Sequence, residues 1–150
     1  MSEERCEPPM GVIPYLHCRK ADEAIAFYEK AFGAKTFCTL KSPDGKIIHG
    51  AIAIEGSTIY LAEEFPEFGG TSPLSLNGTS VTLHIQVKDC EAVFNRAVEA
   101  GCTVVMPLED MFWGDRYGIV VDPYGHKWSI ATTVRAVTSE EMNAALQNFK

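Results

Sequence analysis

The sequence predicts an α+β fold in which two βαβββ modules form a curved, partly open barrel. The first observation is an internal repeat with an offset of 67 residues. It aligns four pairs of identical residues, which are Leu16 with Leu83, His17 with His84, Asp22 with Asp89 and Phe27 with Phe94. The second observation is that a strand, a helix and three strands follow one another in the same order twice. One helix cannot cover both faces of a sheet, so paired modules should enclose a concave inner face.

The first module begins with a β-like run and continues into an amphipathic helix. Apolar residues recur at helical spacing over Ala21–Phe32, and Gly33 provides the stop, since glycine enters the left-handed conformation without a Cβ penalty. Turn residues such as Pro43, Asp44 and Gly45 separate the strands. The predicted strands of this module are Val12–Cys18, Lys35–Lys41, Ile47–Ile54 and Ser57–Ala62.

The second module repeats this arrangement. Asp89 is a favourable N-cap for a helix over Cys90–Ala100, and Gly101 ends that helix. The turn Asp122–Gly125 separates the last two strands. The predicted strands are Val81–Val87, Cys102–Met106, Arg116–Val121 and Lys127–Thr132.

These elements predict a single domain over residues 1–150. It divides into module one at about 11–64, a Pro-, Gly- and Ser-rich linker at 65–79, and module two at about 80–133. A C-terminal helix is expected at about 139–149, because Thr138 and Glu141 form a capping box. Its apolar side should pack on a sheet or on a partner subunit.

Composition excludes several classes of function. The formal charge is −7 without a Lys/Arg cluster, which argues against a nucleic-acid partner and against docking on anionic membranes. The N-terminus lacks the pattern of a signal peptide, and no run of about 18 apolar residues predicts a membrane span. The five cysteines fit neither a complete disulfide framework nor zinc-finger spacing. We therefore expect a cytoplasmic protein.

Three motifs resemble those of PhnB-like proteins, a branch of the vicinal-oxygen-chelate superfamily (the glyoxalase, bleomycin-resistance and dioxygenase type). The resemblance covers about Val12 to Thr133. Its motifs are the helix signature Ala24–Tyr28 with Ala31–Ala34, the segment Phe112–Gly118, and the segment Asp122–Ser129. The resemblance implies a glyoxalase/bleomycin-resistance-like fold, a small-molecule ligand and a homodimer. Whether modules are swapped between subunits is left open by the sequence.

The resemblance also implies where a metal centre would lie. Metal-dependent members use His, Gln or Glu on the first strand of each module and a Glu ending the last strand. The matching positions here hold Ile13, Thr82 and Ser129, while Glu63 or Glu64 lies near the fourth. Because an isoleucine and two hydroxyls are poor ligands, we expect no metal and no other cofactor.

The alternative is a divalent metal with displaced ligands. Under that hypothesis the ligands are His17, His49, His84 and Glu64. By strand alternation His17 shares a face with Ile13, and His84 shares one with Thr82, so both imidazoles are expected to point into the cup. The competing interpretation is that both histidines are hydrogen-bonded at strand ends.

Trp113 and Arg116 are the stronger candidates for ligand contact. Trp113 offers a flat apolar face, and the guanidinium of Arg116 matches carboxylates or phosphonates. The structural alternative is that Trp113 closes the barrel and Arg116 pairs with Asp115. The full set of predicted ligand-binding residues is Trp113, Arg116, His17, His84, His49, Tyr15 and Phe112. His126 and Trp128 are expected to be structural.

Three functions remain open. The favoured one is a PhnB-like protein that binds a small molecule and lacks the usual metal centre. The second is a metal-dependent lyase, isomerase or dioxygenase-like enzyme with non-standard ligands. The third is an interaction domain whose cup is filled with side chains. Neither the ligand nor a reaction follows from the sequence, because this fold hosts many chemistries.

Overall fold

The computed structural model describes residues 8–148, and its first half is one βαβββ unit. Its elements are β1 (Tyr15–Cys18), α1 (Ala21–Phe32), β2 (Lys35–Lys41), β3 (Ile47–Ile54) and β4 (Ser57–Glu63). The strand order is β1-β4-β3-β2, with β1 and β4 parallel and the other pairs antiparallel. Strand β1 begins later than the predicted Val12. Pro14 precedes it, and a proline has no N–H to donate to a ladder.

The second half repeats the unit. Its elements are β5 (Thr82–Gln86), α3 (Cys90–Ala100), β6 (Thr103–Asp110), β7 (Asp115–Val121) and β8 (Lys127–Thr133). The order is β5-β8-β7-β6, and only β5 and β8 are parallel. Strand β6 extends beyond the predicted end at Met106. Its register with β7 shifts between Met106 and Glu109, around Pro107, which is how a strand accommodates a proline.

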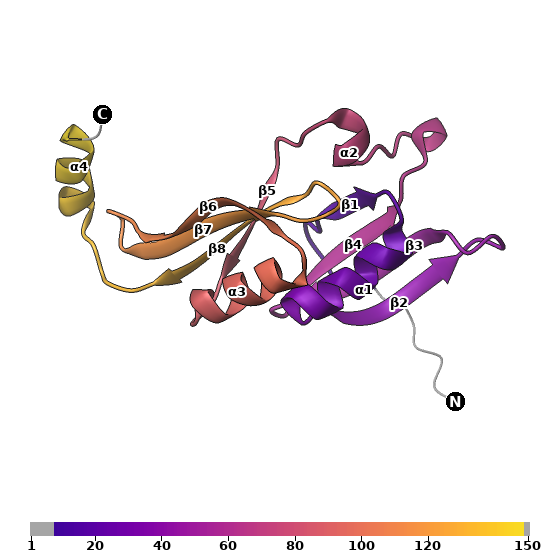
Figure 1. The fold of residues 1–150 in the computed structure, drawn as a ribbon, viewed down its shortest axis with the longest axis horizontal. Helices are drawn as coiled ribbons and strands as arrows, with labels where there is room; N and C mark the ends of the chain where they lie inside the picture. Colours follow the sequence, from indigo (N-terminus) through magenta and orange to yellow (C-terminus); the bar gives the residue numbers. More distant parts are fainter. Residues whose placement is uncertain (1–7, 149–150) are drawn as a thin grey trace.

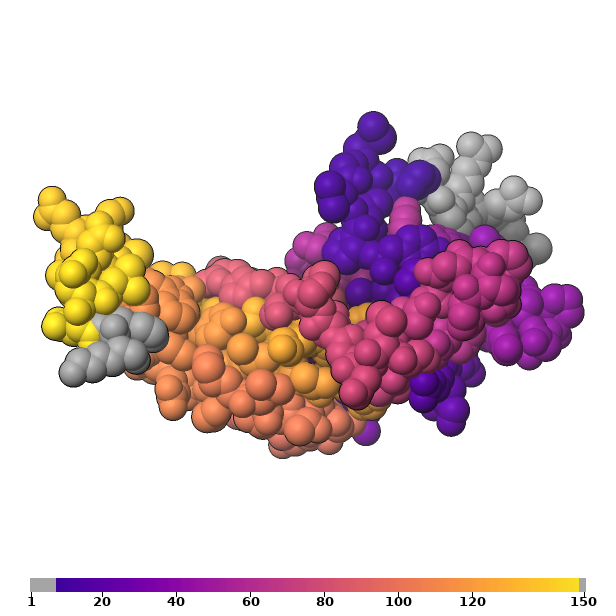
Figure 2. All heavy atoms as spheres, turned by 90° about the horizontal axis from the view of Figure 1, so that it is seen from above, coloured from indigo at the N-terminus to yellow at the C-terminus, as the bar shows by residue number. Residues whose placement is uncertain are grey.

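The linker is more ordered than the sequence predicts. It contains a 3₁₀ turn, η1 (Pro66–Phe68), and a short helix, α2 (Pro73–Leu76). The buried Ser72 caps α2 through a hydrogen bond from the amide of Ser75. Seen from above, the linker lies on the surface over the junction of the two units (Figure 2).

The two units meet through their helices. Helices α1 and α3 lie side by side, and each covers one face of its own sheet (Figure 1). The Arg96 side chain of α3 donates to the carbonyl oxygens of Lys30 (2.8 Å) and Glu29 (3.3 Å) in the last turn of α1. Within residues 8–148 the sheets are curved and unclosed, and they share no strand pairing. The face of each sheet opposite its helix is therefore left open.

Asp122 in the turn between β7 and β8 joins the units from inside the core. Its carboxylate accepts hydrogen bonds from Tyr28 Oη (2.5 Å) on α1 and from Trp128 Nε1 (2.8 Å) on β8. It also accepts from the backbone amides of Tyr124 and His126, at 2.9 and 3.0 Å. All of these residues are buried, which confirms that Trp128 is a core residue. The Asp-Pro-Tyr-Gly turn thus has a structural role.

The C-terminal helix α4 (Ser139–Gln147) begins as predicted. The hydroxyl of Thr138 accepts a hydrogen bond from the amide of Glu141 at 3.1 Å. The helix lies beyond the end of the second sheet, away from the first unit, and none of its residues is buried (Figure 1). Residue 149, the predicted end, lies outside the described residues.

No helix in the described part of the chain is both long enough and apolar enough to cross a membrane.

Candidate functional site

The structure divides the seven predicted ligand-binding residues among three places. On the open face of the first sheet lie Tyr15, His17 and His49. On the open side of the second sheet lie His84, Phe112 and Trp113, of which Trp113 contacts the open-face residue Tyr117. Arg116 instead lies on the helix side of β7, where it contacts α3.

A directed chain of hydrogen bonds crosses the open face of the second sheet. Thr133 Oγ1 donates to the carboxylate of Asp115 (2.9 Å), so this oxygen accepts from Gln86 Nε2 (3.1 Å). The amide oxygen of Gln86 then faces His84 Nε2 (2.7 Å), which must carry a proton. His84 Nδ1 is consequently the acceptor for the hydroxyl of Ser129 (2.7 Å). The orientation of the Gln86 amide thus matches the tautomer of His84 that carries its proton on Nε2.

Aromatic rings stand next to this chain. The ring of Tyr117 stacks on that of His84, with centroids 6.0 Å apart and planes 19° apart. Trp113 meets Tyr117 edge-on at 5.7 Å, and Phe112 meets Trp113 edge-on at 5.1 Å. The open face therefore combines flat apolar surfaces with oriented polar groups, which is the combination that small-molecule sites use.

Arg116 is held by carboxylates on the helix side. Its guanidinium donates to Asp110 Oδ1 and to Glu91 Oε1, both at 2.8 Å. The hydrogen bond from Arg116 holds the pKa of Asp110 below its usual value. The expected partner Asp115 lies on the opposite face and accepts from Thr133 instead, because neighbouring residues of a strand point to opposite faces.

The open face of the first sheet carries a smaller aromatic cluster. The phenol of Tyr15 is hydrogen-bonded to His49 Nδ1 at 2.9 Å, and the rings of Tyr15 and His49 both pack against Tyr60. Burial raises the pKa of Tyr15. The ring of His17 stacks on that of Tyr15, with centroids 5.6 Å apart.

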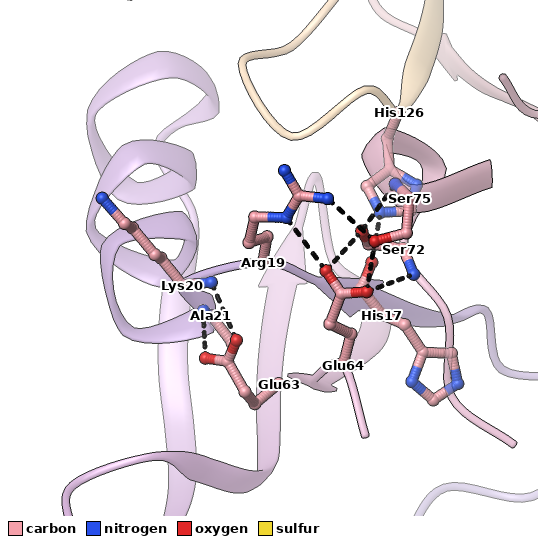
Figure 3. A network of polar contacts seen from close by, with 9 residues as sticks. All are labelled: His17, Arg19, Lys20, Ala21, Glu63, Glu64, Ser72, Ser75 and His126. Atoms are coloured by element: carbon pink, nitrogen blue, oxygen red, sulfur yellow. Dashed lines mark hydrogen bonds and ion pairs between the residues drawn. The ribbon is translucent and has the colours of Figure 1, made fainter. Parts of the chain in front are cut away.

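Glu63, at the end of β4, caps α1. Its two carboxylate oxygens accept from the backbone amides of Lys20 (2.9 Å) and Ala21 (3.0 Å), as Figure 3 shows. Lys20 stands at the N-cap in a left-handed conformation and provides no side-chain cap of its own. A carboxylate from a neighbouring strand therefore supplies the negative charge that a helix N-terminus favours.

Glu64 anchors the linker to the first unit (Figure 3). Its carboxylate accepts from Ser75 Oγ (2.6 Å), Ser72 Oγ (2.8 Å) and Arg19 Nε (3.1 Å). These hydrogen bonds, that from Ser75 foremost, lower the pKa of Glu64 to about 2. The carboxylates of Glu63 and Glu64 thus both make structural contacts.

Of the cavities at the junction of the units, two share the lining residues Pro14 and Leu83. The larger, which we call the central groove, measures about 710 Å³ and is lined by the segment before β1, the β3–β4 turn and β5. Ile13, Thr82, His84 and Gln86 all contribute to its lining. The second, of about 470 Å³, lies between β1, the linker and the start of β5. The groove therefore adjoins the open face of the second sheet through His84 and Gln86.

The donor set does not fit a divalent metal ion. Ile13 offers no lone pair, and the hydroxyl of Ser129 donates to His84. Three of the four alternative ligands make hydrogen bonds within the protein, His49 with Tyr15, Glu64 with the linker, and His84 with Ser129 and Gln86. Among residues 8–148 no three His, Cys, Asp or Glu side chains are grouped so that they could hold a metal ion.

Gln86, Thr133 and Tyr117 contact this cluster of polar and aromatic side chains but were not among the predicted residues. Strand alternation from His84 leads to Gln86, so that residue was within reach of the sequence pattern. Thr133 and Tyr117 enter through the register of β8 with β5 and β7, which the sequence does not specify.

Comparison with known proteins places the chain in a family. The sequence profile of the Glyoxalase/Bleomycin resistance protein/Dioxygenase superfamily matches residues 15–130. An uncharacterized protein of Mycobacterium bovis is 49% identical over 145 residues, covering 95% of this chain and 94% of its own.

Solved structures agree with that assignment. A gene product of Arabidopsis thaliana is 28% identical, with a TM-score of 0.66 over 83% of this chain and 99% of its own. The PhnB protein of Bacillus cereus is 18% identical with a TM-score of 0.63, covering 82% of this chain and 99% of its own, a likeness of fold. The chain therefore belongs to the glyoxalase/bleomycin resistance protein/dioxygenase superfamily.

Proposed function

We propose that this protein binds a small planar organic molecule at the central groove and the adjoining open face of the second sheet, without the usual metal centre of the superfamily. The observation that carries the proposal is the hydrogen-bond chain from Asp115 to Ser129 beside the rings of Tyr117 and Trp113. Ring surfaces bind planar ligands by stacking, and polar groups that are already oriented lose little entropy on binding.

The state of His84 supports binding without a metal. Both of its ring nitrogens are hydrogen-bonded, one to Ser129 and one to Gln86. A metal would have to displace one of these bonds, and the residues at the other expected positions, Ile13 and Thr82, would add at most a hydroxyl.

The proposed site consists of His84, Trp113 and Phe112 together with Gln86 and Tyr117. Arg116 is outside it, since its guanidinium is turned toward α3 and bound by two carboxylates. A ligand carboxylate would have to compete with both of them.

We also propose that the chain acts as a homodimer. Each sheet has one face without a helix, and α4 has no buried residue although Leu146 on it is apolar and 48% exposed. A second copy that covers these surfaces would turn the open faces into walls of a deeper site.

The test is a binding titration with 4-nitrophenol as the planar probe, followed by Trp113 fluorescence and calorimetry. We expect the Kd to rise about tenfold in His84→Ala and in Tyr117→Ala, a loss of about 1.4 kcal/mol. Arg116→Ala is the matched control and should leave the Kd unchanged. Binding that survives His84→Ala but is lost in Arg116→Ala would refute the proposed site.

The metal content of protein purified without a nickel column tests whether the usual metal centre is absent. Because isolated hydroxyls bind divalent ions weakly, we expect less than about one tenth of an equivalent of any divalent ion in both the parent and His84→Ala. About one ion per chain, lost in His84→Ala, would establish a metal centre with displaced ligands instead.

A further inference from the structure

Among the described residues that line the central groove, one has a carboxylate and none is a lysine or an arginine. Most of the lining is apolar, and its polar side chains are hydroxyls, His84, Gln86 and the carboxylate of Glu55. With Nδ1 accepting from Ser129, the His84 ring carries no positive charge. Glu55 therefore gives the groove a negative charge that no basic side chain of the lining neutralises.

Glu55 lies at the rim, where the groove meets two neighbouring cavities. One of these measures about 680 Å³ and is lined by Glu55 together with Lys88, and the other measures about 430 Å³ and is lined by Glu55 together with Lys35. Glu55 is exposed, and within residues 8–148 its carboxylate forms no hydrogen bond and no ion pair, with either lysine or with another residue. A ligand in the mouth of the groove can thus reach this carboxylate without displacing a partner.

The backbone at Glu55 has a conformation that is unfavourable for a glutamate. Glu55 and Gly56 form the two-residue turn between β3 and β4, and both have a positive φ, of 51° and 80°. Such a type I′ turn favours Asn-Gly or Asp-Gly, because asparagine and aspartate tolerate the left-handed region better. The turn therefore gives no reason for a glutamate at this position, and strained positions of this kind are concentrated at ligand sites.

The rest of the wall suits a flat apolar body. Val12, Ile13 and Leu83 are apolar lining residues that remain at least partly exposed. Within the described part of the chain, strand β5 pairs with β8 alone, and all five of its residues line the groove, so its unpaired backbone edge borders the groove. These groups provide contact area and neutral hydrogen bonds, and Glu55 is left as the group that distinguishes ligands by charge.

The open face that adjoins the groove also carries carboxylates. Asp115 accepts from Thr133 on this face, and Glu109 lies directly opposite Tyr117 in the β6–β7 register, so its side chain is on the same face as the tyrosine ring. Lys127, also on this face, lies at the other end of β8 from Thr133 and is not among the lining residues of the groove. A positive charge beside Tyr117 would be attracted by the ring as well as by both carboxylates.

We infer that the central groove selects an organic cation, a planar apolar molecule whose quaternary or protonated amine lies beside the carboxylate of Glu55. This inference rests on the proposed function and names the class of its ligand. The class is opposite in charge to the carboxylates and phosphonates that an arginine binds. Arg116 does not alter this, because Asp110 and Glu91 already bind its guanidinium on the helix side.

The experiment is calorimetric titration of the full chain at pH 8 with three planar probes of similar size. These are the cation 1-methylquinolinium, quinoline, which is uncharged at this pH, and the anion 1-naphthoate. We expect the cation to bind about fivefold more tightly than quinoline, the factor for opposite unit charges about 5 Å apart in surroundings close to water. The anion should bind most weakly.

Variants assign the preference to one residue. Glu55→Gln should lower the affinity for the cation about fivefold, to that of quinoline, and leave quinoline binding unchanged. Glu99→Gln is the matched control, because it removes the same charge from an exposed position on α3 and should leave both affinities unchanged. Glu55→Asn should lose the preference as well, without a fall in Tm because asparagine suits the turn, so that lost binding cannot be ascribed to unfolding.

The outcomes separate this inference from the function on which it rests. Equal affinity for the cation and quinoline, or a preference that survives in Glu55→Gln, overturns the inference. The proposed site still stands in that case if the binding of both probes is weakened in His84→Ala. An equal loss in Glu99→Gln would reflect the net charge of the protein and would overturn the assignment to Glu55. If neither these probes nor 4-nitrophenol binds, the proposed function fails and the inference fails with it.

Discussion

Replacing Asp122 should destabilise the protein more than replacing any exposed carboxylate. In Asp122→Ala, the Tyr28 hydroxyl, the Trp128 indole and two backbone amides lose their acceptor inside the core. A hydrogen bond to a charged group contributes about 1.5–3 kcal/mol, and part of the loss is offset because a buried charge also disappears. The free energy of unfolding should therefore fall by about 3–5 kcal/mol, a large fraction of the 5–15 kcal/mol of a typical domain.

Urea unfolding, followed by tryptophan fluorescence, measures this change. With a slope of about 2 kcal/mol per molar urea, the midpoint should drop by about 2 M. Tyr28→Phe removes one of the four donors and should cost about 1–2 kcal/mol. Asp110→Ala, which removes an exposed partner of Arg116, should leave the midpoint unchanged. If the midpoint of Asp122→Ala stayed within about 0.5 M of the parent, the carboxylate would not be the link between the units.

Three further perturbations test other parts of the structure. The pKa of Glu64 is lowered to about 2 from 4.5, so its contribution to stability is complete above pH 4.5 and is lost as the pH falls toward 2. In Glu64→Gln, acid unfolding followed by circular dichroism should no longer show this pH-dependent loss of stability. An acid-unfolding profile equal to that of the parent would contradict the structural role of Glu64. Gly114→Ala should lower the free energy of unfolding by about 2–4 kcal/mol, because φ is +102° and the new Cβ would clash with the carbonyl oxygen of Arg135. A thermal melt measures the loss, on a scale of about 2–4 °C in Tm per kcal/mol, and a Tm within about 1 °C of the parent would contradict the prediction. The thiols of Cys18 and Cys102 are buried and their pKa values are raised, that of Cys102 to about 12. Neither thiol should therefore react with a thiol reagent at pH 8 until urea unfolds the chain. Rapid labelling of these two cysteines in the folded protein would show that burial does not protect them.

The arrangement of elements was largely readable from the sequence, because periodicity and caps are local signals. Helix α1 has the predicted bounds, and Asp89 caps α3 through the amide of Ala92 as expected. The extension of β6 past Met106 was missed, since it depends on pairing with β7 across an irregular register. The ordered linker was missed for the same reason: Glu64 and Ser72 are separated in sequence and meet only in the fold.

The site was only partly predictable. His84 and Trp113 could be nominated as single residues, but the direction of hydrogen bonding from Asp115 requires knowing which strands are neighbours. The pairing of Arg116 with Asp115, one of the alternatives left open by the sequence, is not formed, since the guanidinium binds Asp110 and, on a helix distant in sequence, Glu91. A side chain's type suggests its chemistry, and the register decides where that chemistry is used.

The pairing of His17 with Ala62 and of His84 with Ser129 distinguishes the two halves of the fold. Both halves keep the same imidazole at the same place, yet one half completes it internally and the other leaves it open. The difference is a single hydroxyl on the facing strand. Equivalent positions in the two halves therefore differ in their hydrogen bonding while the strand pairing around them stays the same.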